Sequence, residues 1–315
     1  MVVVGGGVTG LAAASAFRAR GLPVTLLEAG GRLGGKVETE RVDGFLVERG
    51  PDAVLAQHPA IRALDAGRLA LVPPKEPHDV FVWHRDRLVP LPEGFGFGIP
   101  TRFLPFVLSP LFSPREKLRA ALDVVIPASG AGGDEPIGAL LRRRLGDAVV
   151  ERLAGPRIGG VYGASVDELS LDALVPRLRD AERRHRSLIL AGLAARRRSG
   201  TAPAGPMLLA PLHGMGAVVD ALAAKLDGAD VRLGVRARRL ERGGSAYVVT
   251  LDDGSRIRAD AVVLATPAPE AARLLEEVAP EAVAPLSSFD YRGTAAVSLG
   301  YATAQLAAPP RGHGF

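Results

Sequence analysis

The chain has 315 residues, of which 47% are hydrophobic and 23% charged, and its formal net charge is +5. This composition excludes a disordered chain and predicts a substantial buried core, most simply shared between two domains. The absence of cysteine excludes disulfides, thiolate metal sites and redox-active thiols. The six histidines show no metal-ligand spacing, so the sequence predicts no metal site.

The first 36 residues have the pattern of a dinucleotide-binding βαβ unit. The β-branched run Val2–Val4 leads directly into Gly5-Gly6-Gly7-Val8-Thr9-Gly10. Gly5 permits the tight turn, Gly7 lets the backbone approach a pyrophosphate, and Gly10 lets the following helix pack on the strand. We expect that helix over residues 11–20, with its N-terminal N–H groups facing the phosphates.

The second strand is expected over residues 24–27, and it ends at Glu28. A carboxylate at this place accepts hydrogen bonds from ribose hydroxyls and repels a 2′-phosphate, so NADP is disfavoured. The glycine motif and Glu28 leave FAD and NAD undecided. The next segment, Arg32-Leu33-Gly34-Gly35-Lys36, adds a second glycine pair and two cations, which suits the longer cofactor, FAD.

Several short elements follow. Residues 37–41 and 45–48 alternate around Asp43-Gly44, which predicts a hairpin, and residues 80–84 with 87–90 predict another. A short helix is expected over 59–66. The proline- and phenylalanine-rich stretch 103–112 fits plain core, a cavity wall or a membrane-touching segment, and its two prolines exclude a long helix.

Residues 114–198 have a helical pattern, with helices expected over 115–125, 137–145 and 147–153. We expect a glycine-dense loop over 155–163, which favours close approach of the backbone to a flat ligand. Arginines cluster at 142–144, 183–186 and 196–198. Solvated helix faces are the default reading, and an anionic substrate or a membrane surface is the alternative. No motif supports nucleic-acid binding.

Regular structure resumes near residue 207. A helix is expected over 217–226 and strands over 231–233, 236–241, 247–251 and 256–259. The apolar run 261–265 predicts a central parallel strand buried on both faces, and residues 294–301 predict a strand of a second sheet. The expected domains are 1–78 and 207–270, which together form the nucleotide-binding domain, the helical insertion 79–206, and the start of a substrate-sheet domain at 271–315.

These segments resemble the FAD-dependent protoporphyrinogen/coproporphyrinogen oxidases of haem biosynthesis, within the wider amine-oxidase-like flavoproteins. The wider group is matched at 5–10, 28–29, 32–36 and 264–267. The narrower family is matched at 48–52, 88–92, 98–101, 142–146, 159–162 and 169–170. The implied fold is α/β: a Rossmann-like FAD-binding domain, an inserted helical domain, and a second, incomplete mixed or antiparallel sheet.

The resemblance implies oxidation of a porphyrinogen in three two-electron rounds. A methylene-bridge hydride passes to flavin N5, and dioxygen reoxidises the flavin to give hydrogen peroxide. No catalytic side chain is then required of the protein. The expected cofactor-binding residues are Gly5, Gly6, Gly7, Val8, Thr9, Gly10, Glu28, Ala29, Arg32, Gly34, Gly35, Lys36, Gly50, Pro51, Asp52 and Ala237, whose backbone is expected to hold the adenine.

For the substrate, the resemblance points to Gly160 as the position where the macrocycle lies close. Arg157 and Arg102 are candidate propionate partners, with ordinary salt-bridge or surface roles as the alternative. Coproporphyrinogen III is favoured over protoporphyrinogen IX, because four propionates need more cations and the chain is rich in arginine. A hand-off to ferrochelatase is a further expected partnership.

Two expectations concern the chain as a whole. The first strand starts at Met1, which predicts a cytoplasmic protein without a signal peptide, either free or peripheral at the membrane. The chain stops at Phe315 within the second sheet, so we expect a truncated chain that binds FAD poorly and turns over little or not at all. The rival interpretations are another flavin amine oxidase or phytoene desaturase-like enzyme, and a non-catalytic porphyrin-binding fragment.

Overall fold

The computed structural model describes residues 1–56, 58–61, 69–74, 80–92, 94–96, 99–100, 103–129, 133–199 and 208–308. The chain divides into two compact units, one made of residues 1–74 with 205–305 and the other of residues 75–204 with 306–315. The first unit is therefore assembled from two stretches of sequence that are separated by the second unit.

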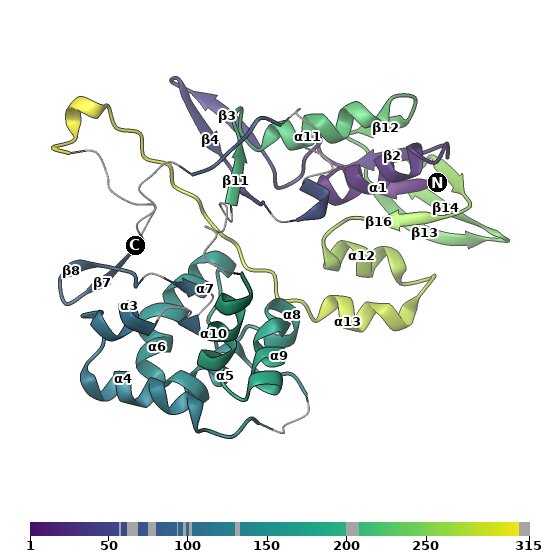
Figure 1. Cartoon of the computed structure of the whole chain (residues 1–315). Coiled ribbons are helices and arrows are strands. Elements are labelled where there is room, and N and C mark those ends of the chain that lie inside the picture. Colours follow the sequence, from purple (N-terminus) through teal and green to yellow (C-terminus); the bar gives the residue numbers. More distant parts are fainter. Residues whose placement is uncertain are drawn as a thin grey trace. The chain divides into compact units, whose positions relative to one another are not determined.

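A parallel sheet forms the centre of the first unit (Figure 1). Its strand order is β12 (Asp230–Leu233), β2 (Thr25–Glu28), β1 (Val2–Val4) and β16 (Val262–Leu264). β1 is buried on both faces, because Val3 packs into one core cluster while Val2 and Val4 pack into another. The expected Rossmann-like parallel sheet is confirmed.

The position of β16 corrects one prediction. The strand is parallel, as expected, but it lies at the edge of the sheet rather than at its centre, because β1 is its one neighbour among the described strands. Its three residues are accordingly half-buried rather than buried on both faces. The apolar sequence of β16 therefore predicted more complete burial than an edge strand has.

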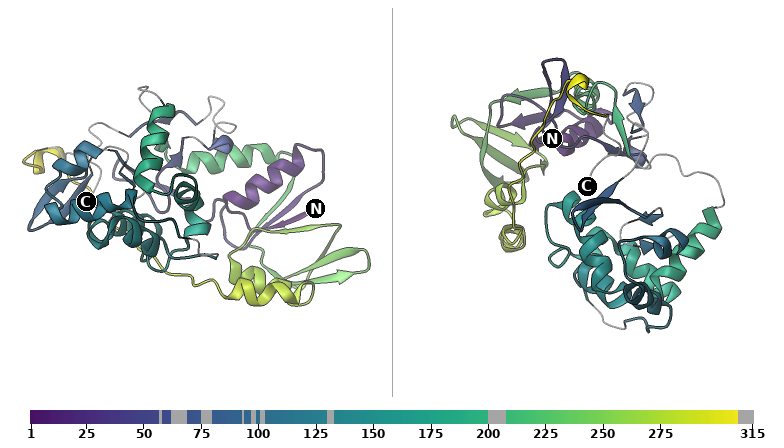
Figure 2. Two further views of the ribbon diagram at one scale, coloured as in Figure 1. Left: turned by 60° about the horizontal axis from the view of Figure 1, so that its bottom comes forward. Right: turned by 90° about the vertical axis from the view of Figure 1, so that its left-hand side faces the viewer.

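Two helices cover one face of the parallel sheet. α1 (Val8–Arg18) and α11 (Gly216–Ala223) lie side by side (Figures 1 and 2). Leu11 and Ala14 of α1 share a buried cluster with Val218 and Leu222 of α11. The predicted helices thus form close to their expected places, and the apolar face of each is what the sheet buries.

A hairpin from the first stretch caps the helix of the second. β3 (Thr39–Val42) and β4 (Phe45–Glu48) form the predicted hairpin, with positive φ at Asp43 and Gly44. The carboxylate of Glu48 accepts the N–H of Met215 at 2.8 Å, and Thr39 Oγ1 accepts the N–H of Gly216 at 2.8 Å. These side chains satisfy N–H groups that the start of α11 would otherwise leave unpaired.

The opposite face of the sheet is covered by an antiparallel sheet of β13 (Ala237–Gly243), β14 (Ala246–Leu251) and β15 (Arg256–Ala259). The remaining elements of this unit are short: β5 (Val54–Leu55), β6 (Leu71–Val72), β11 (Leu208–Pro211), α12 (Ala268–Leu275), α13 (Val283–Ser287) and the 3₁₀ turns 224–226, 280–282 and 303–305. Of the helix expected over 59–66, residues 62–66 lie outside the described residues.

The strand expected over residues 294–301 is not formed. This segment has no strand partner among the described residues, so its backbone N–H and C=O groups make no ladder. Val297 and Leu299 would lie on the same face of a strand, the face that a half-buried strand covers. Their side chains are instead 80% and 72% exposed. The prediction of a strand is therefore wrong here, because a β-pattern in the sequence forms a strand only where a neighbouring strand pairs with it.

The second unit is mainly helical. Its elements are the hairpins β7 (Phe81–His84) with β8 (Arg87–Pro90) and β9 (Phe95–Gly96) with β10 (Ile99–Pro100), and the helices α3 (Phe103–Leu108), α4 (Pro114–Ala121), η1 (Leu122–Val124), α5 (Ile137–Leu145), α6 (Asp147–Val149), η2 (Val150–Ala154), α7 (Gly155–Tyr162), α8 (Leu171–Leu174), α9 (Pro176–His185) and α10 (Leu188–Ser199). Phe106, Leu140, Leu141 and Leu153 belong to its single core cluster.

The segment expected to be a glycine-dense loop is helical. η2 is a π-helix in which the N–H of Gly155 donates to the carbonyl of Val150, and α7 follows without a break. Pro156 lies in the first turn of α7, where a missing N–H costs little. A Cβ on Gly155 would approach Val150 O at 2.9 Å, so the absent side chain lets the chain pass from the π-turn into the α-helix.

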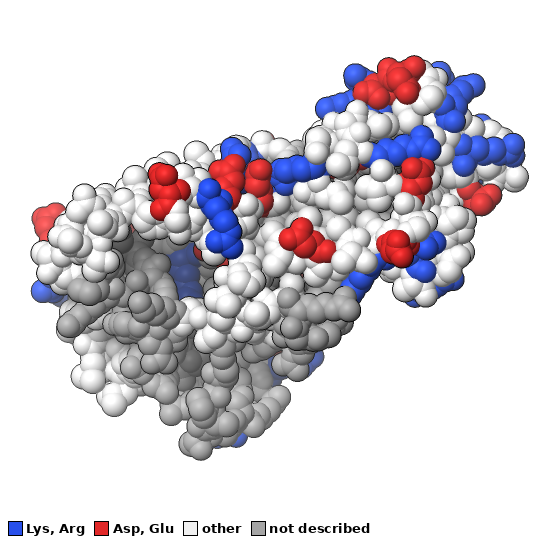
Figure 3. Space-filling model, turned by 90° about the horizontal axis from the view of Figure 1, so that it is seen from above, with Lys and Arg blue, Asp and Glu red and all other residues white. Residues whose placement is uncertain are grey.

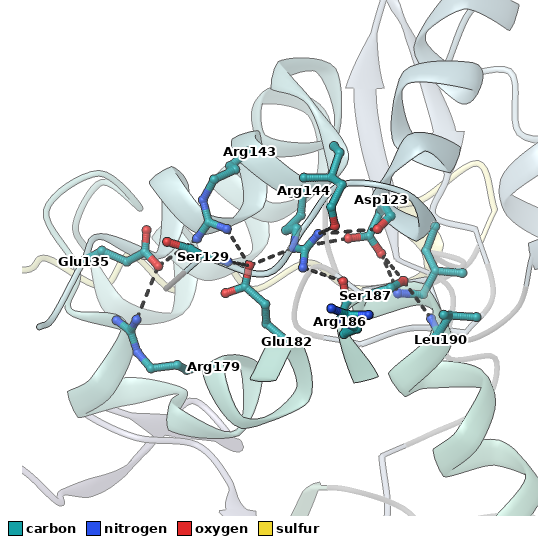
Figure 4. Close-up of polar contacts among 12 residues, drawn as sticks. Asp123, Ser129, Glu135, Arg143, Arg144, Arg179, Glu182, Arg186, Ser187 and Leu190 are labelled. Atoms are coloured by element: carbon teal, nitrogen blue, oxygen red, sulfur yellow. Dashed lines mark hydrogen bonds and ion pairs between the residues drawn. The ribbon is translucent and has the colours of Figure 1, made fainter. Parts of the chain in front are cut away.

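The arginines of α5 are not all on a solvated face. Arg144 is fully buried, and its Nε lies 2.9 Å from Glu182 Oε1 and 3.5 Å from Asp123 Oδ1. Asp123 also accepts the Ser187 hydroxyl and the N–H of Ile189 (Figure 4). The default reading is therefore wrong at Arg144, which ties η1, α5, α9 and the start of α10 together inside the helical unit.

Candidate functional site

The first unit contains a cavity of about 540 Å³ at the ends of β1, β2 and β16. Ten of the predicted cofactor-binding residues line it: Gly5, Gly7, Val8, Thr9, Glu28, Ala29, Gly34, Gly35, Lys36 and Ala237. Six do not: Gly6, Gly10, Arg32, Gly50, Pro51 and Asp52. Sequence reasoning missed other lining residues, among them Arg236, Thr266, Pro267, Glu270 and Tyr291.

The three motif glycines serve different contacts. Gly5 has φ +108°, and a Cβ there would lie 2.6 Å from Ala265 O. A Cβ on Gly10 would lie 1.8 Å from Gly5 O, so α1 can pack on β1 because this side chain is absent. A Cβ on Gly7 would meet no protein atom nearer than Gly35 Cα at 4.0 Å. The space beside Gly7 is open to the cavity, which is what a bound phosphate requires.

Glu28 organises the loop as well as lining the cavity. Its Oε2 accepts the N–H of Gly6 and its Oε1 accepts the N–H of Gly30, both at 2.6 Å. Gly6 is necessarily small, because a Cβ would lie 2.8 Å from the Cβ of Glu28. An ionised carboxylate has about four acceptor positions, so two remain for the hydroxyls of a ribose.

The two cations of the second glycine pair have different surroundings. Arg32 does not line the cavity; its guanidinium donates to the carbonyls of Val37 and Gly35 at 3.1 and 2.9 Å and pairs with Glu38 at 2.8 Å. Lys36 does line the cavity. No carboxylate among the described residues lies within ion-pair distance of its ammonium, whose nearest aromatic partner is the Tyr291 ring at 5.7 Å from the centroid.

Residues 50–52 do not line the cavity, but Gly50 packs against the backbone of Lys36, which does. A Cβ on Gly50 would lie 1.9 Å from the carbonyl oxygen of Lys36, so Gly50 supports the backbone of the lysine that reaches the cavity. Pro51 and Asp52 are exposed.

Ala237 lines the cavity near Arg236. Its carbonyl oxygen already accepts a hydrogen bond from Arg273 Nη2 at 3.0 Å, which leaves one lone pair for another donor. Thr266, on the far side of the cavity, has a buried Oγ1 that makes no hydrogen bond to any described residue. A buried hydroxyl without a protein partner leaves its hydrogen-bonding capacity to a polar ligand or to an ordered water. These groups together fit a dinucleotide.

The predicted substrate residues lie in the second unit. Gly160 and Arg157 are three residues apart on α7 and so occupy one face of the helix. Gly160 is exposed, and nothing lies within 4 Å of the place of its Cβ. Arg157 is half-buried and makes no ion pair with the described residues. Arg102 lies outside the described residues.

A second, smaller cavity of about 310 Å³ lies among α4, α5 and η2. Arg152 donates to Glu116 at 2.8 and 2.9 Å and to the carbonyl of Leu111 at 2.7 Å. The hydrogen bonds from Arg152, and then from the backbone of Ser113, lower the pKa of Glu116 to about 2. The cations of this cavity are thus largely committed to the fold.

Charge is mixed on the face of the described surface that Figure 3 draws. Basic and acidic side chains alternate on the face drawn in Figure 3 rather than forming one basic patch. Among the described residues no cluster of His, Asp and Glu could hold a metal ion. None of the helices in the described ranges is long and apolar enough to cross a bilayer.

Comparisons with known proteins add to this geometry. The family model described as flavin containing amine oxidoreductase matches residues 8–313. The chain is 40% identical to the coproporphyrinogen III oxidase of Propionibacterium freudenreichii subsp. freudenreichii, over 100% of this chain and 66% of that protein. It is 35% identical to the coproporphyrinogen III oxidase of Bacillus subtilis (strain 168), over 100% of this chain and 69% of that protein.

A solved structure is also similar. A protein from Exiguobacterium sp. 255-15, described as a protoporphyrinogen oxidase, superposes with a TM-score of 0.74 at 36% identity, covering 89% of this chain and 62% of that one. The chain thus spans about two thirds of the length of the relatives it matches.

Proposed function

This chain belongs to the flavin containing amine oxidoreductases, and from that premise we propose that it oxidises a porphyrinogen, coproporphyrinogen III in preference to protoporphyrinogen IX, with FAD as its cofactor. The observation that carries the proposal is the cavity of the first unit, whose glycines, carboxylate and lysine are those expected for the ADP half of FAD. When bound, FAD supplies the two-electron acceptor, and dioxygen is the final acceptor.

The residues of the chain have distinct roles in this proposal. The open space beside Gly7 and the N-terminus of α1 receive the pyrophosphate. Glu28 accepts the ribose hydroxyls with its remaining lone pairs, and the ammonium of Lys36 neutralises negative charge of the cofactor. Thr266 donates or accepts through its otherwise unpartnered hydroxyl.

Gly160 and Arg157 support the substrate assignment. An exposed position without a side chain lets a flat macrocycle approach the helix, and an arginine one turn away can pair with a propionate. Coproporphyrinogen III is preferred because the relatives at 40% and 35% identity are named for it.

We also propose two partners of the protein, ferrochelatase and a membrane surface. Product transfer to ferrochelatase and docking at a membrane surface both need an exposed face on the protein. Leu104 and Leu108, one turn apart on α3, are 66% and 71% exposed, which supports peripheral docking. Flotation of the protein with anionic and neutral vesicles, at low and high salt, tests the membrane contact.

The experiment for the proposed function offers coproporphyrinogen III, protoporphyrinogen IX and putrescine to protein loaded with FAD. In contrast to the low turnover expected from the sequence, the proposal predicts that porphyrin fluorescence rises with the porphyrinogens, faster with coproporphyrinogen III, and that peroxide is released. Peroxide release with the amine alone overturns the proposal. Porphyrin binding without bound flavin or turnover would instead favour a non-catalytic binding role.

A further inference from the structure

Tyr291 lines the cavity of the first unit from a largely exposed position. It belongs to a segment that has no regular structure, and it lines the cavity together with residues of both walls. Its hydroxyl accepts the N–H of Ala268 at 3.0 Å, and its ring lies 5.7 Å from the Lys36 ammonium. One side chain thus interacts with both Lys36 and the N–H group of Ala268 at the start of α12.

The contact with α12 fills a specific need. Pro267 is the N-cap of this helix, and it gives no side-chain hydrogen bond to the N–H groups of the first turn. Pro269, the second residue of the helix, has no N–H at all. The Tyr291 hydroxyl therefore supplies a cap that the local sequence does not, and it anchors the segment to the helix.

The contact with Lys36 has an electrostatic consequence. The ammonium lies within the range at which an aromatic face attracts a cation, and no described carboxylate competes for it. The ring restrains the lysine at the rim of the cavity without neutralising its charge. A carboxylate in the same place would instead repel an anionic ligand.

Resting on the flavin assignment above, we infer that Tyr291 is a positioning residue for the dinucleotide. It holds Lys36 toward the anionic part of the ligand and, through the hydrogen bond from Ala268, ties its own segment to the start of α12. The ligand class is an adenine dinucleotide or its ADP half. Loss of the ring frees the lysine, whereas loss of the hydroxyl alone releases the tether.

The test titrates the protein with FAD and, separately, with ADP, following binding by flavin fluorescence and by calorimetry. Tyr291→Leu should weaken both affinities about tenfold and speed FAD release, and Tyr291→Phe, which keeps the ring, should recover part of that loss. Tyr301→Leu is the matched control, because Tyr301 is exposed in the same segment and does not line the cavity.

A double-mutant cycle distinguishes positioning from a structural role. In a Lys36→Met background, Tyr291→Leu should cost less than threefold in ADP affinity, since the restrained charge is already gone. Equal losses in both backgrounds, or unchanged affinity in every Tyr291 variant, overturn the inference while the flavin assignment stands. A wild-type protein that binds neither FAD nor ADP overturns both.

Discussion

Arg144 and Glu182 form an ion pair from which solvent is excluded: Nε lies 2.9 Å from Oε1, and the two side chains are 0% and 2% exposed. Burial opposes the charge on Glu182, but hydrogen bonds from Arg143 and the backbone of Ser129 keep the pKa of Glu182 below its ordinary value. The Arg144 guanidinium also donates to the carbonyls of Ile126 and Arg186, at 2.7 and 2.5 Å. The pair is therefore part of a larger network, in which Arg144 Nε and Asp123 Oδ1 are held by ion-pair contacts without a hydrogen bond of their own.

Replacing Arg144 with methionine should destabilise the helical unit strongly. The substitution leaves Asp123 buried without a cation and Glu182 with Arg143 alone, and breaking a buried pair in this way costs about 3–5 kcal/mol. Urea unfolding followed by helical circular dichroism measures the loss. Arg184→Met, at an exposed position of α9, should change the free energy of unfolding by less than about 0.5 kcal/mol; equal effects of the two variants contradict the assigned role.

Two glycines of the first motif should separate binding from folding. Gly7→Ala places a methyl group in open space, so stability should change by no more than about 0.5 kcal/mol while FAD and ADP binding are lost. Gly10→Ala forces α1 away from Gly5 and should cost about 3 kcal/mol or more. Thermal unfolding and ADP titration of both variants check this, and a Gly7 variant that binds normally would count against the phosphate site.

Glu28→Gln should weaken nucleotide binding, because Glu28 both orders the glycine loop and faces the cavity. The amide can no longer accept both the Gly6 and the Gly30 N–H groups, so the loop loosens and the ribose loses an acceptor. Hydrogen bonds to charged groups are worth about 1.5–3 kcal/mol, which predicts a fall in ADP affinity of roughly tenfold to a hundredfold. Glu40→Gln is the control, because the half-buried Glu40 does not line the cavity. An affinity of Glu28→Gln within twofold of wild type would refute the prediction.

Acid should destabilise the helical unit through Glu116. The pKa of Glu116 in the folded protein is about 2, below the ordinary value of 4.5 for a glutamate, so the unfolded state binds the proton more readily. The contribution of this group is therefore complete above about pH 5 and is lost as pH falls toward 2. Urea midpoints of wild type and Glu116→Gln should differ at pH 6 and converge by about pH 2. Glu151→Gln, exposed on η2, provides the comparison; a gap independent of pH excludes this linkage.

Gly160→Ala should have opposite effects on stability and on porphyrin binding. A Cβ there meets no atom within 4 Å, and alanine favours the helix over glycine by roughly 0.8–1 kcal/mol. Gly160→Leu extends the test, because a large side chain would block a flat ligand. Fluorescence quenching of coproporphyrin III should weaken in the order Gly160, Ala, Leu. Unchanged binding in both variants would place the porphyrin elsewhere.

The elements that depend on local sequence were predicted well. The strand–glycine–helix unit at residues 2–18 and the hairpin at Asp43-Gly44 follow from steric rules that act over a few residues. The hairpin β7–β8 and the helix α5 also lie within a residue of their expected bounds. The residues that begin and end each of these elements are local in sequence, so the element could be predicted without knowledge of distant contacts.

The errors share a different origin. The burial of Arg144 depends on Asp123 and Glu182, neither of which is near it in sequence, so an arginine run looked solvated. The helix α7 was taken for a loop because its glycines were counted without the π-turn that accommodates them. Tyr291 interacts at the cavity with Lys36, which is far from it in sequence. No local sequence motif predicts this interaction.

The cap that Glu48 provides for Met215 joins residues 167 positions apart, and this has a consequence for the newly made chain. At a synthesis rate of about 5–20 residues per second, the hairpin waits roughly 10–30 s before the start of α11 leaves the ribosome. During that interval the apolar faces of β1, β2 and α1 have no second helix to cover them. The helical unit is synthesised in this interval, so we expect the first unit to depend more than the helical unit on chaperones during synthesis.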